Sequence, residues 1–468
     1  MRFLRRFFDY FLRVLRGFSL ERFLFALVLL SLPLNLGKHF IFPFAYVNGK
    51  LIDYLIPTLY VHDILVFLLL LVALPKLVVF WKGFLLMKGK RSWSLIFLTL
   101  FLWSVFLSVV SSFEFAPSFY AYLRLFLYAG FVLYIPFRNF KYHTSQKLPK
   151  SLISKVSGFL SQYHTWFAFL ILALSVLGIL QWLHQGSIFD NYLILGEQPY
   201  TFSTPGIVKE NFFGVTKIPP YGTFRHPNVF AGFLSFGLLI VFNSFLQRKA
   251  GPLYALTFLL GTITLFLTFS WFVMAAFLLS LVVLTLLQKT PSLGNRLIYL
   301  VLALLLLLTF ILPFSTHLPL LNTSSLQRRS NLLTIGFQLI KQRPLFGIGY
   351  NNFTYFVDQL SIYNGFAKFT QPIHNIYMLL LVESGIFSLT FFILFLASLI
   401  KNLLNNFPKK SFQIRQNNRQ SKPLLITLIL HLLLLGGFDH YLLTAHQMQL
   451  LFWLTIGIAL QYNFLDEV

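Results

Sequence analysis

The sequence predicts an all-α polytopic membrane protein, because of its composition, its long apolar runs and the placement of its basic residues. Of the 468 residues, 57% are hydrophobic and 11% are charged. Runs such as 297–314 contain no charged residue, and they approach the ~20 residues that cross a bilayer as a helix. A soluble chain of this length would interleave charge every few positions. A large soluble domain is therefore excluded.

About twelve stretches are long and apolar enough to span a membrane with some tilt. In chain order they are 20–37, 62–82, 93–113, 117–137, 163–184, 227–247, 252–269, 270–288, 297–314, 372–400, 423–439 and 445–464. The first follows a basic N-terminus and lacks a small-residue cleavage site, so it predicts an uncleaved helix. We expect a single membrane domain over residues 1–468, with both termini cytoplasmic.

The segments between these helices predict their orientation. Lys and Arg concentrate in every second segment, among them 76–91, 138–155 and 401–422. By the positive-inside rule these segments are cytoplasmic. The net charge of +24 then reflects membrane topology, so we expect no nucleic-acid partner.

Two segments on the outer side are long, about 185–226 and 315–371. The second holds one acid, Asp358, and a clear excess of basic residues, namely Arg328, Arg329, Lys341, Arg343 and Lys368. Basic groups on the outer face favour a polyanionic ligand, although a plain solvated loop is the alternative. The apolar spacing of 326–342 predicts an amphipathic helix that Pro344 stops. We expect this outer loop to be catalytic.

Three motifs lie in or beside these outer segments. Residues 221–232 are Tyr-Gly-Thr-Phe-Arg-His-Pro-Asn-Val-Phe-Ala-Gly, residues 344–349 are Pro-Leu-Phe-Gly-Ile-Gly, and His-Asn-Ile-Tyr at 374–377 precedes Glu-Ser-Gly-Ile at 383–386. In order and spacing they resemble the signatures of the O-antigen ligase and polymerase family of bacterial membrane proteins, over roughly residues 60–460.

The chain departs from that family at two places. At 268–271 it has Thr-Phe-Ser-Trp, where the family usually has Thr-x-Ser-Arg. The Arg that often precedes Gly-Thr-Phe in the family is also missing, so Arg225 or Lys217 is expected to substitute.

The resemblance implies a glycosyltransferase of the bacterial cytoplasmic (inner) membrane. Family members pass a glycan from a polyprenyl diphosphate carrier to an acceptor on the outer face, without a metal. The sequence agrees, since it has no Asp-x-Asp, Walker or His-Glu-x-x-His motif and no Cys for a thiolate site. We expect no cofactor and no metal. The expected partners are the lipid-linked glycan, its acceptor and membrane lipids.

Three residues are the candidates for catalysis. His374 stands at the outer mouth of a predicted span, where imidazole can accept a proton from an acceptor hydroxyl near neutral pH; a helix-capping His is the alternative. Arg329 leads its motif, and Arg225 stands at an outer span entrance. Both are expected to hold the diphosphate and stabilise its charge as it leaves. A solvent-facing Arg329 and an interfacial Arg225 are the alternatives.

Six further residues are candidates for substrate binding: Asn228, Lys217, Arg124, Arg343, Asn375 and Tyr377. A role in the helix entry for Asn228 and snorkelling for Arg124 are alternatives. Gly347 and Gly349 are expected to shape a turn. Structural roles are expected for the remaining acids and histidines near the outer ends of spans, namely Asp63, Glu383, Asp439, His226, His317, His440 and His446.

The nature of the acceptor stays open at this point. It can be a glycolipid (a ligase), the end of another lipid-linked chain (a polymerase) or a protein hydroxyl (an oligosaccharyltransferase). From a different class, a transporter or flippase would move the lipid-linked glycan without breaking a bond. The ionisable residues cluster at the outer face and the sequence shows no clear internal repeat, which favours the enzyme.

Overall fold

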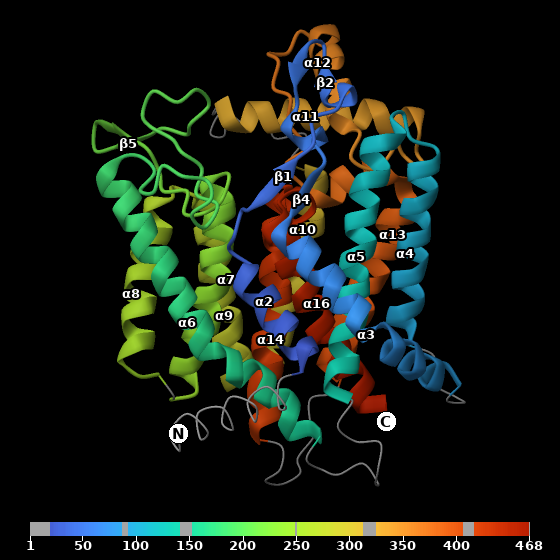
Figure 1. The fold of residues 1–468 in the computed structure, drawn as a ribbon, viewed down its shortest axis with the longest axis vertical. Coiled ribbons are helices and arrows are strands. Elements are labelled where there is room, and N and C mark those ends of the chain that lie inside the picture. The colour runs from blue at the N-terminus through green and yellow to red at the C-terminus, as the bar shows by residue number, and fades with distance from the viewer. Residues whose placement is uncertain are drawn as a thin grey trace, which may run out of the picture.

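The computed structural model describes residues 19–86, 92–140, 152–248, 250–311, 324–405 and 416–467. Long helices stand side by side in a bundle, and short strands and two further helices gather at one end of it (Figure 1). We call that end the cap, and it comprises 37–60, 185–226 and the described part of 315–375. The prediction of a polytopic, mostly helical membrane protein is confirmed. The strands of the cap correct the expectation of a purely α fold.

Seven helices in the described part of the chain are long and apolar enough to cross a membrane. They are α3 (Val61–Leu86), α4 (Trp93–Val110), α5 (Phe115–Phe140), α6 (Leu152–His184), α7 (Pro227–Leu246), α9 (Trp271–Lys289) and α13 (Ile376–Asn405). The other predicted spans overlap α2 (Leu20–Ser31), α8 (Pro252–Leu267), α10 (Pro291–Ile311), α14 (Gln416–Phe438) and α16 (His446–Glu467). These do not meet the same criterion within the described residues, so seven of the twelve predicted spans are candidate membrane spans in the structure.

The first predicted span ends early because of Pro33. α2 stops at Ser31 after 12 residues, since a proline ring cannot continue a helix. A helix of that length reaches about 18 Å, well short of the ~30 Å hydrocarbon core. The predicted loop 401–422 is also shorter than expected, because α13 runs to Asn405 and α14 begins at Gln416. Its positions 406–415 lie outside the described residues.

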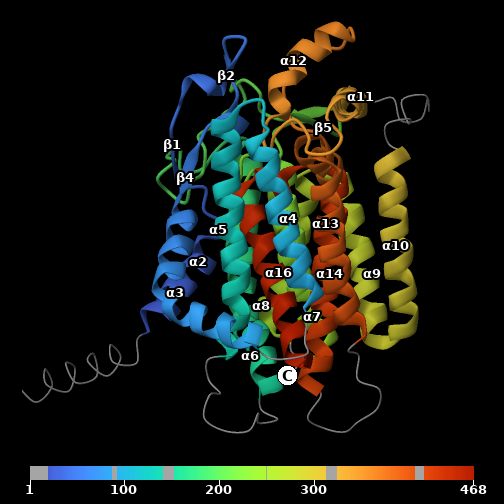
Figure 2. The same ribbon diagram turned by 90° about the vertical axis from the view of Figure 1, so that its right-hand side faces the viewer.

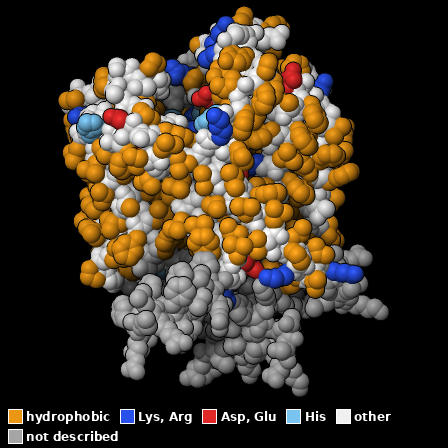
Figure 3. All heavy atoms as spheres, in the orientation of Figure 1, with side chains coloured by type: hydrophobic (Ala, Val, Ile, Leu, Met, Phe, Trp, Pro, Cys, Tyr) orange, Lys and Arg blue, Asp and Glu red, His pale blue; other side chains and the backbone are white. Residues whose placement is uncertain are grey.

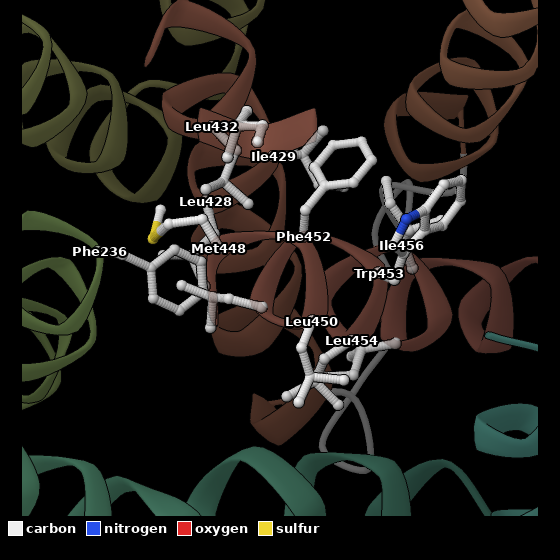
Figure 4. Close-up of a cluster of buried hydrophobic side chains, with 14 of the residues drawn as sticks. Phe236, Leu428, Ile429, Leu432, Met448, Leu450, Phe452, Trp453, Leu454 and Ile456 are labelled. Carbon is white, nitrogen blue, oxygen red and sulfur yellow. The ribbon is translucent and has the colours of Figure 1, made fainter. Parts of the chain in front are cut away.

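Hydrophobic side chains cover the flank of the bundle, and charged side chains gather toward its ends (Figure 3). Where the structure describes their side chains, at 227–246, 422–438 and 446–461, α7, α14 and α16 are almost entirely buried. Figure 4 shows Phe236 of α7, Leu428 of α14, and Met448 and Phe452 of α16 close together in this core. Helices that are apolar all round belong in such a position. Their cap-side ends carry the polar residues described below.

The cap contains three two-stranded antiparallel sheets and several short helices. The strand pairs are β1 (Gly37–His39) with β4 (Thr58–Tyr60), β2 (Tyr46–Val47) with β3 (Lys50–Leu51), and β5 (Glu210–Phe212) with β6 (Val215–Lys217). The helices are η1 (Pro43–Ala45), η2 (Asp53–Leu55), α11 (Ser324–Gln342) and α12 (Phe353–Tyr363). The short helix α15 (Tyr441–Thr444) lies between α14 and α16 in the chain. Figure 2 shows α12 rising beyond α11 at the cap end. The predicted helix 326–342 is confirmed, and it ends before Pro344 as expected.

Helix α13 is broken at Gly385, whose φ of 77° is left-handed. The loop 344–349 packs directly into this break, and the N–H of Gly349 donates to the carbonyl of Glu383 at 2.9 Å. Gly347 and Gly349 also have positive φ, and a Cβ on either would collide with the neighbouring chain. The prediction that these glycines shape a turn is confirmed. Their close approach fixes the loop between α11 and α12 to the bundle.

Candidate functional site

A cavity of about 450 Å³ lies at the cap end of the bundle, within the size range of ligand sites. Its walls come from the segment 50–60, from α5, and from residues within 225–229, 370–374 and 439–449. Figure 3 shows a hollow at this end of the molecule with Lys and Arg side chains at its edge. Of the predicted site residues, four line the cavity: Arg124, Arg225, Asn228 and His374.

His374, Asp439 and His440 form a compact group in this cavity. A ring nitrogen or carboxylate oxygen of each lies within 4.8 Å of those of the other two. The two imidazole rings meet edge to face, with centroids 4.9 Å apart. His374 lies two residues before the start of α13, while the other two residues connect α14 to α15. The packing of α13 against α14 therefore assembles the group.

Hydrogen bonds fix the ring of His440. The hydroxyl of Thr444 donates to the carbonyl of His440 at 3.2 Å, so it accepts from Nδ1–H at 2.7 Å. In the neutral ring, Nε2 then carries a lone pair and faces the Asp439 carboxylate at 3.9 Å. Nδ1 of His374 is buried and has no hydrogen-bond partner in the described part of the chain. The group thus offers acceptors, which suit a substrate hydroxyl and are also the donor set of a divalent metal ion.

Burial and neighbouring charges set the protonation states of the group. Burial lowers the pKa of His374 well below 6.5, and nearby His440 and Arg329 lower it further, while Asp439 opposes them. Burial also lowers the pKa of His440 to about 4, again against Asp439. Burial alone would raise the pKa of Asp439, but the facing histidines and Arg329 lower it to about 2. At neutral pH two neutral imidazoles stand beside one carboxylate, so His374 is free to accept a proton.

Asn228 links the start of α7 to this group. Its Oδ1 accepts from the hydroxyl of Ser270 at 2.8 Å, and its Nδ2 donates to Asp439 at 3.4 Å. Ser270 belongs to the segment 268–271, where the sequence departs from the family pattern. Trp271, in the place of the family's Arg, is 56% exposed at the start of α9 and does not line the cavity. The departure therefore keeps the serine contact and removes a cation from this position.

Arg329 lies beside the group rather than in the cavity wall. Its Nη1 donates to the carbonyl of Phe438 at 2.9 Å, and its guanidinium lies over the ring of Phe272, 5.4 Å from the centroid. It shares a small adjoining pocket with His374. Its charge contributes to the lowered pKa values of His374 and Asp439. Helix α11 thus places a permanent cation within electrostatic reach of His374.

Arg124 and Arg225 both line the cavity but have different partners. Nη2 of Arg124 forms an ion pair with Asp63 at 3.1 Å. Nη2 of Arg225 instead contacts Nε2 of His39 at 2.7 Å, and its Nε is buried without a hydrogen-bond partner among the described residues. The charge of Arg124 is matched within the wall, so its predicted substrate contact is weakened. Arg225 contributes positive charge to the cavity.

Besides Arg329, four further predicted residues do not line the cavity. Lys217 ends β6, and exposed Arg343 donates to the carbonyl of Ser111 at 3.0 Å. Asn375 is buried and accepts from the N–H of Tyr377 at 3.0 Å, which caps α13. The buried hydroxyl of Tyr377 donates to the carbonyl of Leu433 at 3.0 Å. Asn375 and Tyr377 thus make hydrogen bonds within the protein, and their contact with substrate stays a prediction.

The cavity also uses residues that the sequence did not assign to chemistry. Asp439 and His440, which were expected to be structural, stand next to His374. The sequence signal for their role was the adjacent acid and histidine at the end of the predicted span 423–439. The ring of Tyr54 meets that of His440 edge-on at 5.4 Å. His39 contacts Arg225. No sequence signal marks Tyr54 or His39, because both reach the site only through the folding of segment 37–60.

Residues 256–393 match the family model described as O-antigen ligase. The match confirms the resemblance over these residues, which contain the motifs at 344–349 and 374–386. The match extends from α8 into α13 and includes Arg329 and His374. Arg225 and Asp439 lie outside it, on either side. No curated protein matches the chain.

Proposed function

We propose that this chain, which carries an O-antigen ligase domain, transfers a glycan from a polyprenyl diphosphate carrier to an acceptor hydroxyl at the outer face of the bacterial cytoplasmic membrane. The observation that supports this best is the single cavity that contains neutral His374, the carboxylate of Asp439 and the charge of Arg225. Transfer from a diphosphate needs a base for the acceptor and fixed positive charge for the leaving group. The cap faces outward and both termini are cytoplasmic in this proposal, following the distribution of basic residues.

His374 is the general base of the proposed reaction. It accepts the proton of the acceptor hydroxyl while that oxygen attacks the anomeric carbon of the donor glycan. The bond from this carbon to the diphosphate oxygen breaks, and polyprenyl diphosphate leaves with the electron pair. Asp439 stabilises the imidazolium that forms, and Asn228 holds Asp439 in place. His374 then releases its proton to solvent.

Arg225 and Arg329 stabilise the departing diphosphate. Guanidinium groups bind phosphate oxygens through paired hydrogen bonds, and Arg225 has donor capacity to spare in the cavity. Charge that is already in position needs no reorganisation as the bond breaks. Because these cations supply the charge that a metal ion would supply, the proposed transfer is metal-independent.

A glycolipid is the acceptor in the main form of the proposal, which makes the protein a ligase. A surface polysaccharide polymerase and a protein O-oligosaccharyltransferase are the alternatives with the same donor chemistry. If the protein were a flippase, the lipid-linked glycan would occupy the same cavity, but no bond in it would break. Only the enzymes release free polyprenyl diphosphate.

The test is release of the carrier from a labelled, lipid-linked glycan by purified protein with a chelator present. Wild type is compared with His374→Ala and Arg329→Ala, and candidate acceptors are supplied in turn. We expect chelator-resistant release that is lost in His374→Ala and strongly reduced in Arg329→Ala. Transport of the donor across proteoliposomes without any release of carrier would contradict the proposal.

A further inference from the structure

The two arginines of the cavity wall share an aromatic neighbour but differ in charge balance. The guanidinium carbons of Arg124 and Arg225 lie 5.0 and 6.0 Å from the centroid of the Tyr60 ring. Arg124 is paired with the carboxylate of Asp63. Among the ion pairs of the described residues, none involves Arg225. One wall therefore holds a neutralised guanidinium and a second whose charge is left over.

The partner of Arg225 is a neutral acceptor. A guanidinium can only donate hydrogen bonds, so Nε2 of His39, 2.7 Å from Nη2 of Arg225, must present a lone pair. An imidazole with a free lone pair carries no charge. His39 thus holds one arm of Arg225 in place without cancelling its charge.

The position of His39 is itself well defined. It ends β1, where it pairs with Thr58 of β4. Tyr60, at the end of β4, packs tightly against Gly37 of β1 and leaves no room for a Cβ at position 37. His39 therefore stands on the same pair of strands as Tyr60, whose ring centroid lies 6.0 Å from the guanidinium carbon of Arg225.

We infer that His39 is a positioning residue that orients Arg225 through a neutral hydrogen bond and so reserves its full charge for a phosphate group of the lipid-linked donor. This inference rests on the proposed function and deepens it by locating the diphosphate end of the cavity at Arg225. A carboxylate at position 39 would orient Arg225 equally well but would neutralise it, as Asp63 neutralises Arg124. Substitutions at position 39 can therefore separate two effects, the orientation of the Arg225 side chain and the neutralisation of its charge.

The test compares three replacements of His39 in the purified full-length protein. His39→Gln retains a neutral acceptor, His39→Glu adds a charge, and His39→Leu removes the acceptor. We expect KM for the donor to stay near the wild-type value in His39→Gln and to rise at least about tenfold in His39→Glu. His39→Leu should lie between them, and kcat should change little in all three. Lys38→Gln, an exposed change on the same strand, is the matched control.

Inhibition by inorganic pyrophosphate gives a second readout that does not depend on the glycan. Its inhibition constant should rise in His39→Glu and in Arg225→Ala, and should remain unchanged in His39→Gln and Lys38→Gln. Thermal unfolding checks the fold of each variant, and His39→Leu replaces His39→Glu if the latter does not fold. Equal effects of Gln and Glu, or no effect of Glu, would overturn the role of His39. If Arg225→Ala also leaves both constants unchanged, the proposed role of Arg225 in diphosphate binding fails as well.

Discussion

Replacing Asp439 by Asn removes one negative charge beside His374 and leaves the shape of the side chain almost unchanged. The amide oxygen can still accept from Asn228, which donates to Asp439 at 3.4 Å in the native protein. What is lost is the attraction between the carboxylate and the imidazolium that forms when His374 takes a proton. The variant therefore isolates one electrostatic contribution to the proposed transition state.

The size of this contribution follows from the distance between the two groups. The relevant atoms lie within 4.8 Å of each other, and the side chain of Asp439 is only 13% exposed. With an effective dielectric constant of about 20, a charge pair at that distance is worth about 3.5 kcal/mol. Asp439→Asn should then lower kcat by a factor on the order of a few hundred.

The assay is release of labelled polyprenyl diphosphate at saturating donor and acceptor, with thermal unfolding to confirm the fold. Asp53→Asn is the matched control, because Asp53 is an exposed carboxylate that lines the same cavity. We expect the control to retain kcat within about threefold. If Asp439→Asn keeps more than about a tenth of the wild-type kcat, the carboxylate does not stabilise charge on His374 and the mechanism must be revised.

Three further predictions concern the same region. Burial lowers the pKa of His374 well below 6.5, and the base form of His374 is lost only as pH falls through that pKa. The value of kcat should therefore stay level from about pH 8 to about pH 6. A fall of kcat to half its value near the ordinary histidine pKa would refute this. The Gly385→Ala variant should melt at a clearly lower temperature than the Gly49→Ala variant. Both glycines have φ near +77°, but only at position 385 would a Cβ lie against neighbouring backbone. Equal melting temperatures would contradict the packing argument. Thr444→Val should lower kcat about fivefold by removing the hydroxyl that fixes the ring of His440, while an unchanged rate would show that the orientation of this ring is unimportant.

The positions of the helices follow from local signals in the sequence. Apolar runs locate many of their ends within a few residues, although α6 begins at Leu152 rather than near 163, and Pro344 marks the end of the cap helix as predicted. Pro33 carries the same signal at the end of α2, where the apolar run beyond it misleads. Whether such a run can cross the bilayer depends on where the helix stops, and this explains why α2 and α8, with 12 and 16 residues, fall short of a span.

The contents of the cavity could be predicted only in part. His374, Arg225 and Asn228 stand in compact motifs whose residues lie close together in the sequence. Their partners do not, since His39 is 186 positions from Arg225 and Asp439 is 211 positions from Asn228. No local pattern relates such pairs, so only the packing of the helices shows which polar groups meet.

Glu383 shows that helical periodicity alone does not reveal the partners of a side chain. A regular helix would turn Glu383 and His374 to different sides, which argues against a shared role. In the structure the helix breaks at Gly385, and the Glu383 carboxylate accepts from the N–H groups of Asn351 and Phe353 at 3.0 and 3.1 Å. A structural role for Glu383 is still expected. The physical reason is that its carboxylate accepts hydrogen bonds from these backbone N–H groups, not that it lies on a different side of the helix.

The cavity takes its walls from both ends of the chain, from 50–60 and from 439–449. During synthesis the first of these segments leaves the ribosome long before the second. A nascent or truncated chain that stops before Asp439 holds His374 and Arg225 but lacks the carboxylate that completes the group. The order of synthesis thus completes the group of His374, Asp439 and His440 only when the end of the chain is being made.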